Sequence, residues 1–359
     1  MSAARLVTPP ESILVVRLGA MGDVIHTLAA VTALRSALPK LRIGWLVEER
    51  WSELLSAKES PRRGAPSAQR PLADFVHVVD TKRWRKSPIA SETCKQIKSA
   101  RHEIRNQKYA VAADFQGALK SAFMARLSGS SMVIGFEHPR EAPATLLYHE
   151  KFAATGAHVI EQYRSLSEVI AGRALPDCAP LLPRDEQAET RMAAKLAAIG
   201  REFVLINPGA GWGAKEWPAE RYGEVARALA SLGLVPIINF GPGEQELATA
   251  VNHACGGEAE LMSSSITELI ALTRRARLFI GGDTGPLHLA AALHIPIVAI
   301  FGPTDPERNG PYGTNSIVLR NPSSRTSLSH TNVSDPGLLK ITADEVISAA
   351  HKLVESSSA

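Results

Sequence analysis

The chain alternates short apolar runs with longer stretches in which apolar residues recur at helical spacing. Runs rich in Val, Ile and Leu are typical of strands buried on both faces of a parallel sheet. In the first half, the strands predicted from these runs are Ser12–Leu18, Leu41–Val47, Phe75–Val79, Ala110–Phe115 and Met132–Phe136. The first strand is followed by a predicted helix over Val24–Leu38, which Pro39 ends.

A Pro-rich segment separates this half from a second one of similar design. Residues Ala174–Arg184 (ALPDCAPLLPR) follow a helical pattern that ends near Ala171. The alternation then restarts, and the predicted strands are Glu202–Asn207, Val235–Phe240, Leu278–Gly281 and Ile297–Phe301. The predicted helices are Ala219–Leu232, Glu244–His253, Ile266–Arg275, Pro286–Leu293 and a closing helix Thr342–Glu355.

These patterns predict an α/β protein with two doubly wound, Rossmann-like domains that face each other across a cleft. We predict an N-terminal domain over residues 1–175, a linker at 176–184, a second domain at 185–340 and a C-terminal helix at 341–359. Ligands of open α/β sheets bind beyond the carboxyl ends of the strands. The chemistry is therefore expected in the segments that directly follow strands.

Composition agrees with this picture and narrows the class of protein. A chain of 359 residues is too long for one ordinary core, and 45% hydrophobic with 21% charged residues is typical of a soluble globular protein. No apolar run is long enough to span a bilayer, and Met1–Pro10 lacks the pattern of a signal peptide. We therefore expect a cytoplasmic protein. Its three cysteines are widely spaced and predict neither a metal site nor a disulfide framework.

The net charge of +4 is too small to indicate a nucleic-acid partner, but it is unevenly spread. One basic cluster surrounds Trp84 and comprises Lys82, Arg83, Arg85 and Lys86. Such a cluster attracts phosphates, acidic sugars or an anionic membrane surface. A second cluster comprises Arg62, Arg63 and Arg70. Because prolines and glycines surround it, we interpret Lys58–Pro71 as a flexible, solvated insertion.

The segment Leu278–Leu293 (LFIGGDTGPLHLAAAL) is the strongest candidate for chemistry. A predicted strand runs into Gly281-Gly282-Asp283-Thr284-Gly285, and Pro286 stands where a helix begins. Glycines permit close backbone approach, and the first N–H groups of the helix form an anion site. His288 would donate to a phosphate or sugar oxygen from the first turn. Asp283 suits helix capping or sugar hydroxyls, and an ordinary capped turn is the structural alternative.

Two further loops follow predicted strands of the same half. The loop Asn207–Pro218 (NPGAGWGAKEWP) contains Lys215 and glycines that suit a diphosphate, although its spacing is not that of a P-loop. Gly241-Pro242-Gly243-Glu244 follows the next strand. Glu244 either starts a helix as an acid favoured by the dipole or accepts hydrogen bonds from ribose hydroxyls. The sequence leaves these two interpretations even.

In the first half, Arg17–Thr27 (RLGAMGDVIHT) joins the first strand to its helix. The glycine spacing is G-x-x-G rather than G-x-G-x-x-G, which disfavours an NAD-dependent dehydrogenase. Asp23 stands where a pyrophosphate would arrive. It is either a helix cap or a carboxylate that takes a proton from an attacking hydroxyl. Since the chain has no Asp-x-Asp motif and no metal-ligand spacing of histidines, we expect no required metal and no cofactor.

Six segments, ordered through both halves, carry a family resemblance: MGDVIHT at Met21–Thr27, WLVEE at Trp45–Glu49, RWRK at Arg83–Lys86, DFQGALKS at Asp114–Ser121, PREAPA at Pro139–Ala144 and GGDTGPLHLAAAL at Gly281–Leu293. Together they are similar to the family 9 glycosyltransferases, of GT-B fold, and among them to the lipopolysaccharide heptosyltransferases. The resemblance implies an inverting enzyme that moves L-glycero-D-manno-heptose from its ADP donor to Kdo of the lipid A inner core.

The resemblance also implies roles for individual residues, with the acceptor bound by the N-terminal half and the donor by the C-terminal half. Asp23 matches the general base. The donor-binding positions are Ala210, Gly211, Lys215, Glu244, Ser264, Asp283, Thr284, Gly285 and His288. The acceptor-binding positions are Arg17, Lys82, Arg85, Lys120 and Arg140. Lys215 and His288 would serve the phosphates, Glu244 the ribose and Asp283 the heptose hydroxyls.

The implied partners are ADP-L-glycero-D-manno-heptose as a substrate, Kdo-lipid A as the acceptor and the cytoplasmic face of the inner membrane, which the enzyme would touch peripherally; no nucleic acid is expected. The RWRK segment would meet either that membrane or the acceptor phosphates. The alternatives are heptosyltransferase II, a family 9 transferase of another ADP-sugar, and a sugar-nucleotide-binding protein without activity. The presence of Asp23 argues against the last of these.

Overall fold

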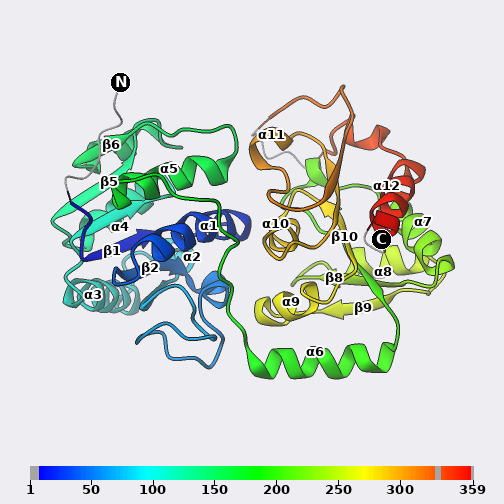
Figure 1. Cartoon of the computed structure of the whole chain (residues 1–359), viewed down its shortest axis with the longest axis horizontal. Coiled ribbons are helices and arrows are strands. Elements are labelled where there is room, and N and C mark those ends of the chain that lie inside the picture. Colours follow the sequence, from blue (N-terminus) through cyan, green and yellow to red (C-terminus); the bar gives the residue numbers. More distant parts are fainter. Residues whose placement is uncertain (1–7, 328–332, 357–359) are drawn as a thin grey trace. The chain divides into compact units, whose positions relative to one another are not determined.

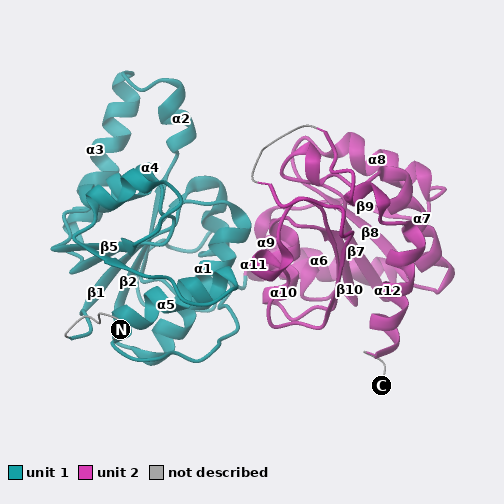
Figure 2. Ribbon diagram, turned by 90° about the horizontal axis from the view of Figure 1, so that it is seen from above, with its two compact units in different colours: residues 1–184 teal, residues 185–359 magenta. Residues whose placement is uncertain are grey.

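The computed structural model describes residues 8–327 and 333–356. The chain divides into two compact units, residues 1–184 and 185–359, each built on a six-stranded sheet (Figures 1 and 2). Every strand pairing in both sheets is parallel. The predicted α/β class is thereby confirmed. Residues 176–184, which the sequence suggested as a linker, fall within the first unit.

The first unit has the strand order β3-β2-β1-β4-β5-β6. Its strands are β1 Ser12–Val16, β2 Arg42–Glu48, β3 Phe75–Val79, β4 Val111–Asp114, β5 Met132–Phe136 and β6 Glu150–Phe152. Its helices are α1 Met21–Ala37, η1 Glu49–Leu54, α2 Thr81–Lys86, α3 Ser91–Asn106, α4 Leu119–Leu127, η2 Ala142–Leu147 and α5 Val159–Ala171.

Helices cover both faces of this sheet, which explains the continuous apolar runs of its strands. Helices α1 and α5 pack together on one face, and α3 and α4 lie on the other (Figure 2). All five residues of the central strand β1 are buried. Helix α1 is buried along most of its length, so its sequence is apolar nearly all round rather than striped.

The second unit has the order β12-β11-β10-β7-β8-β9. Its strands are β7 Phe203–Asn207, β8 Val235–Phe240, β9 Glu260–Ser263, β10 Leu278–Gly282, β11 Ile297–Phe301 and β12 Ser316–Arg320. Its helices are α6 Glu186–Ile199, η3 Gly213–Lys215, α7 Ala219–Ser231, α8 Gln245–Ala254, α9 Ile266–Thr273, α10 Gly285–Ala292, α11 Pro306–Asn309, η4 Leu338–Lys340 and α12 Ala343–Ser356.

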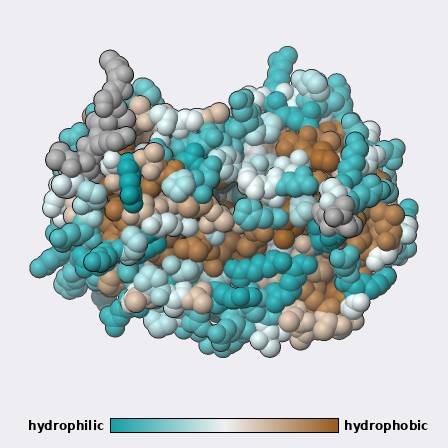
Figure 3. Space-filling view, viewed as in Figure 1, coloured by the Kyte–Doolittle hydropathy of each residue, from teal (hydrophilic) through white to brown (hydrophobic). Residues whose placement is uncertain are grey.

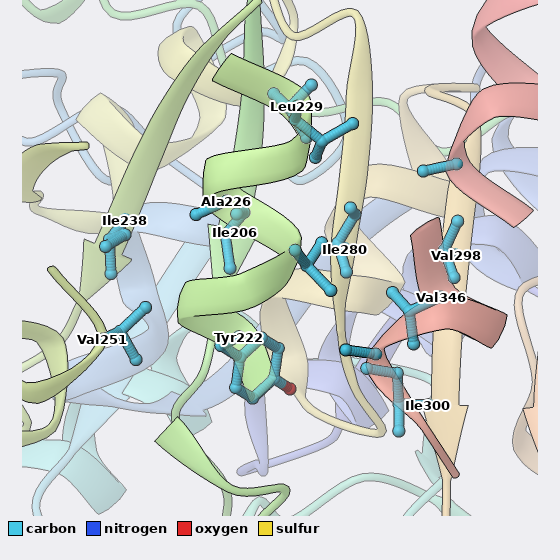
Figure 4. Close-up of a cluster of buried hydrophobic side chains, with 14 of the residues drawn as sticks. Ile206, Tyr222, Ala226, Leu229, Ile238, Val251, Ile280, Val298, Ile300 and Val346 are labelled. Atoms are coloured by element: carbon cyan, nitrogen blue, oxygen red, sulfur yellow. The ribbon is translucent and has the colours of Figure 1, made fainter. Parts of the chain in front are cut away.

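One large core of this unit lies between the sheet and the helices α7, α8 and α12. In Figure 4, Tyr222 and Leu229 of α7 lie over the central strands of the sheet, and Val346 of α12 lies beside Ile300 of β11. The last helix therefore belongs to the core of the second unit.

The sequence pattern missed the strands β6, β9 and β12. These are three of the four edge strands of the two sheets. An edge strand is covered less completely, and β6 (EKF) and β12 (SIVLR) have mostly exposed or half-buried side chains. They therefore lack the continuous apolar run that marks a central parallel strand.

The predicted flexible insertion is held by one buried arginine, so that interpretation was wrong for Arg70. Its side chain is only 3% exposed. The guanidinium donates to the carbonyl oxygens of Ala73 (2.8 Å), Gly64 (2.7 Å), Ala65 (2.8 Å) and Pro61. Five donors on a planar group can satisfy several carbonyls at once, so Arg70 fixes the loop from within. The side chains of Arg62 and Arg63 are exposed, as expected.

We expect Arg70→Met to loosen this loop while Arg63→Met leaves it closed. Each lost bond to a charged donor costs about 1.5–3 kcal/mol. Water can replace the guanidinium at the exposed residues Pro61, Gly64 and Ala65 but not at Ala73, which is fully buried. Limited proteolysis with mass-spectrometric mapping of cleavages within residues 58–71 measures the effect. Equal cleavage rates for the two variants would show that Arg70 does not hold the loop.

Candidate functional site

The candidate donor residues come from loops at the carboxyl edge of the second sheet. Strands β7 and β10 are neighbours, so the loops that follow them lie side by side. Lys215, in the loop after β7, places its Nζ against the Asp283 carboxylate and 3.2 Å from the Asp283 carbonyl oxygen. Nε2 of His288, in the first turn of α10, lies 3.1 Å from Oδ1 of Asp283. The structure thus joins three of the predicted residues through one carboxylate.

This cluster, Lys215–Asp283–His288, is almost withdrawn from solvent, with side-chain exposures of 9%, 8% and 7%. Burial alone would raise the pKa of Asp283. The hydrogen bond and charge of His288 and the charge of Lys215 outweigh burial, so the pKa of Asp283 lies well below its usual range. Lys215 Nζ also lies 4.1 Å from the centre of the Trp212 ring. Asp283 is therefore an ionised anchor that fixes two cationic or donor groups.

The turn between β10 and α10 forms a helix start that no side chain of its N-cap residue caps. Thr284 is the N-cap residue in an extended conformation, and its side chain makes no cap hydrogen bond. Pro286 lies in the first turn and has no N–H. The remaining early N–H groups point out of the helix, where they suit an anion. Gly281 has a different role, because a Cβ there would lie 2.9 Å from the Asn207 carbonyl oxygen of β7.

The structure shows one of the two roles that the sequence left open for Glu244, that of an acid at the start of a helix. It is the N-cap residue of α8, and its Oε2 accepts the Gly241 N–H at 2.7 Å. The other carboxylate oxygen lies against Gly209 so closely that a Cβ at Gly209 would overlap it. Residue 209 lacks a side chain because the Glu244 carboxylate occupies the space where its Cβ would lie. The loop after β7 and the start of α8 therefore pack directly against each other.

We expect Gly209→Ala to push aside the flexible end of the Glu244 side chain and break its bond to the Gly241 N–H, which should destabilise the second unit by about 1–2 kcal/mol. The same substitution in a Glu244→Ala background should cost much less, because the overlapping carboxylate is gone. Urea unfolding of the four proteins of this cycle measures both values. Equal costs in the two backgrounds would assign the strain to another contact.

The other predicted donor positions are less closely tied to the cluster. Ala210 is half-buried and Gly211 is exposed, with open space around its Cα. Ser264 directly follows β9, and its Oγ is buried without a hydrogen-bond partner in the part of the chain that the structure describes. Two further side-chain oxygens, Asn239 Oδ1 near the end of β8 and Thr304 Oγ1 after β11, are also buried without a hydrogen-bond partner among the described residues. Sequence reasoning missed these two, although each stands at a strand end.

In the first unit, Arg17 and Asp23 form a pair at the carboxyl end of β1. Arg17 Nη2 lies 2.6 Å from Asp23 Oδ1, and Asp23 Oδ2 accepts the Ala20 N–H at 3.1 Å. Asp23 therefore caps α1, and its side chain is still 35% exposed. Arg17 is 4% exposed, donates from Nη1 to the Phe115 carbonyl oxygen at 2.7 Å and lies over the Tyr163 ring. Arg17, predicted to bind the acceptor, is thus buried and fixes the orientation of Asp23.

Lys120 is held at the same edge of the sheet. Its Nζ donates to Glu48 Oε1 (3.2 Å) and to Thr81 Oγ1 (2.7 Å), while about half of the side chain stays exposed. Glu48 is buried and also accepts the Thr81 N–H. The remaining predicted acceptor residues, Lys82, Arg85 and Arg140, are exposed on α2 and before η2.

The conformation of the motif Asp114–Ser121 is fixed by the buried carboxylate of Asp114, which the sequence did not mark as a functional residue. Asp114 is fully buried and accepts from Tyr148 (2.7 Å), Ser121 (2.9 Å) and the Gln116 N–H (2.9 Å). Burial raises the pKa of its carboxyl group despite these bonds. Asp114 thereby fixes the turn that starts α4 and presents Lys120. Leu119 and Phe123, on the same helix, are 47% and 55% exposed.

Over residues 8–327 and 333–356, no three His, Cys, Asp or Glu side chains come together as a metal site would require. Within the same ranges, no helix has the length and apolar content needed to cross a bilayer. On the face seen in Figure 3, hydrophobic residues form separate patches among hydrophilic ones.

Comparison with known proteins identifies the family of this chain. The model of glycosyltransferase family 9 (heptosyltransferase) matches residues 97–336. Lipopolysaccharide heptosyltransferase 1 of Pseudomonas aeruginosa is 29% identical over 313 residues, 86% of this chain and 83% of that protein. The enzyme of the same name from Escherichia coli K12 is also 29% identical, over 86% of this chain and 93% of its own length.

Solved structures agree in fold. Escherichia coli heptosyltransferase WaaC with ADP is 26% identical, with a TM-score of 0.77 over 95% of this chain and 99% of that chain. A family 9 glycosyltransferase from Veillonella parvula has a TM-score of 0.80 at 22% identity, over 98% of this chain and 99% of its own. The predicted resemblance, including the GT-B fold, is confirmed. The chain belongs to glycosyltransferase family 9, the heptosyltransferases.

Proposed function

We propose that this enzyme transfers L-glycero-D-manno-heptose from its ADP donor to Kdo of the lipid A inner core, with inversion at the anomeric carbon. The observation that carries the proposal is the Arg17–Asp23 pair. In this pair a buried arginine fixes a partly exposed carboxylate. The carboxylate lies at the carboxyl ends of the strands of the first unit, where open α/β sheets bind their ligands. Family membership gives the reaction class, and this carboxylate supplies a base for it.

The second unit would hold the donor. The WaaC structures solved with ADP and with ADP-2-deoxy-2-fluoro heptose are each 26% identical to this chain and support an ADP-heptose donor. Lys215, His288 and the first N–H groups of α10 would face the diphosphate. Asp283, which holds both side chains, would also meet heptose hydroxyls, and Glu244 would take the ribose. Together these groups stabilise the charge that develops on the leaving phosphate.

The chemical step is a single displacement. The acceptor hydroxyl loses its proton to Asp23, and the oxygen attacks the anomeric carbon of heptose as its bond to the β-phosphate of ADP breaks. The electron pair of that bond leaves with ADP. Arg17 pairs with Oδ1 of Asp23, and the Ala20 N–H donates to Oδ2. These two contacts fix the orientation of the carboxylate. We propose that this step needs neither a metal ion nor a cofactor.

The acceptor would be bound by the first unit through its basic side chains. Lys120, Lys82, Arg85 and Arg140 suit the carboxylates of Kdo and the phosphates of lipid A. The exposed Leu119 and Phe123 beside Lys120 suit an acceptor that is itself amphipathic. We propose that the enzyme works in the cytoplasm at the inner-membrane surface, because lipid A lies in the inner leaflet during its synthesis.

The test is an ADP-release assay with ADP-heptose and Kdo-lipid A, run with and without EDTA. ADP should appear only when both substrates are present, at the same rate in the two conditions, and the product should gain one heptose by mass spectrometry. Transfer only to an acceptor that already carries heptose would indicate a heptosyltransferase II. Donor binding without transfer to either acceptor would indicate a protein that only binds the sugar nucleotide.

A further inference from the structure

The segment of residues 81–108 carries far more positive charge than the rest of the molecule. It contains nine Lys or Arg residues and two Glu residues, a net charge of +7 in a chain whose total is +4. The segment comprises α2, a short turn and α3. The function proposed above uses only Lys82 and Arg85 of this set, so most of the charge has no assigned role.

On α3 the charge is arranged as a stripe. At 100° per residue, Lys95, Lys98, Arg101 and Arg105 fall within about 120° of the helix circumference. All four are exposed. The apolar positions Ile97, Ala100 and Ile104 lie on a different face, where Ile104 is buried in the core of the unit. Lys95, Lys98 and Arg101 of this stripe face solvent, while Arg105 at the end of the helix also donates from Nε to the Leu127 carbonyl oxygen at 3.2 Å.

Helices α2 and α3 form a hairpin that projects from the body of the first unit, with its turn at the far end (Figure 2). Trp84 of α2 donates from Nε1 to Gln96 Oε1 of α3 at 3.0 Å, which ties the two helices together. Ile89 lies in the turn and is 93% exposed, the largest exposure of any large hydrophobic side chain among the described residues. A single exposed isoleucine is ordinary on a protein surface, but this one stands at the leading end of a cationic projection, where it would be the first apolar group to meet an anionic surface.

We propose that the α2–α3 hairpin docks on the surface of an anionic lipid bilayer, with Ile89 entering the headgroup region and the α3 stripe lying over acidic headgroups. Charge complementarity with one apolar side chain at the leading end fits a bilayer interface, where both are used at once. Few aromatic side chains are available for stacking on bases, which disfavours nucleic acid. The inference rests on the proposed function, which requires the enzyme to meet a lipid acceptor.

The test is co-sedimentation of the full-length protein with vesicles of phosphatidylglycerol mixed equally with phosphatidylcholine, and of phosphatidylcholine alone. The wild type should bind the anionic vesicles, and binding should weaken as sodium chloride is raised. The double variant Lys95→Glu/Lys98→Glu should bind at least about tenfold more weakly. Ile89→Glu should bind about tenfold more weakly as well, because it removes the apolar contact.

The matched controls are Lys195→Glu/Lys352→Glu, which makes the same change in net charge on exposed lysines of α6 and α12, and Leu232→Glu. Both should bind like the wild type. Equal losses in the controls, or full binding by the hairpin variants, would overturn the proposed surface. Transfer to a deacylated, water-soluble Kdo acceptor should be unchanged in the hairpin variants. Loss of that activity would place Ile89 and the α3 stripe in the acceptor site with Lys82 and Arg85 and would overturn the bilayer contact. Failure of the wild type to transfer would count against the proposed function alone.

Discussion

Asp23→Asn is expected to lower kcat for heptosyl transfer by about 10²–10⁴-fold, the range that a positioned general base contributes. Asparagine has nearly the same shape, and its carbonyl oxygen can still accept from Arg17 or from the Ala20 N–H. What it cannot do is take the proton of the acceptor hydroxyl. Binding of ADP by the second unit should be unchanged, because its predicted ligands lie in residues 210–288 of the other unit.

The measurement is single-turnover transfer together with calorimetric titration of ADP and thermal unfolding. Asp23→Ala serves as the comparison, since it leaves the buried Arg17 without its carboxylate and should also lower stability. If Asp23→Asn keeps most of the wild-type kcat, the carboxylate is a cap and an arginine partner only. If both variants lose ADP binding, the effect is on folding rather than on the base.

The fold was predictable from the sequence wherever burial imposed a pattern. The strand β1 and its neighbours are covered on both faces, so most of their residues are apolar and the runs stand out. The edge strands β6, β9 and β12 are under no such constraint and were missed. Arg70 shows the opposite error. Its neighbours have the composition of a solvated loop, and only tertiary contacts reveal that its guanidinium is buried against four carbonyl groups.

The candidate site was predictable as a set of positions but not as a set of contacts. Strand ends and glycine turns pointed to Asp23, Lys215 and Asp283, because parallel sheets gather their ligand groups at one edge. The pairing of Arg17 with Asp23 joins the end of a strand to the third residue of a helix, and the family resemblance had implied only an acceptor role for Arg17. Asp114 escaped notice for a related reason, since a fully buried carboxylate is recognised by its partners and not by its spacing.

The pKa of Asp283 gives a pH-dependent expectation. Its folded-state pKa is depressed, so the stability it contributes is present above its unfolded value of about 3.9 and is lost as pH falls toward the folded value. The difference in unfolding free energy between the wild type and Asp283→Asn should therefore be largest near neutral pH. It should shrink steadily in urea titrations carried out below about pH 4.

Asp283→Ala is expected to have the largest effect on the second unit. It leaves Lys215 and His288, both less than a tenth exposed, without the carboxylate that holds them, and removing one partner of a buried pair costs about 3–5 kcal/mol. Since the same two side chains are proposed to face the diphosphate, ADP binding should fall as well.

The double variant Asp283→Ala/Lys215→Met separates the two effects. It removes the unpaired charge and should recover part of the unfolding free energy, yet ADP affinity should stay low because a proposed phosphate ligand is missing. If the double variant instead binds ADP like the wild type, Lys215 does not serve the phosphates, and its role is confined to pairing with Asp283.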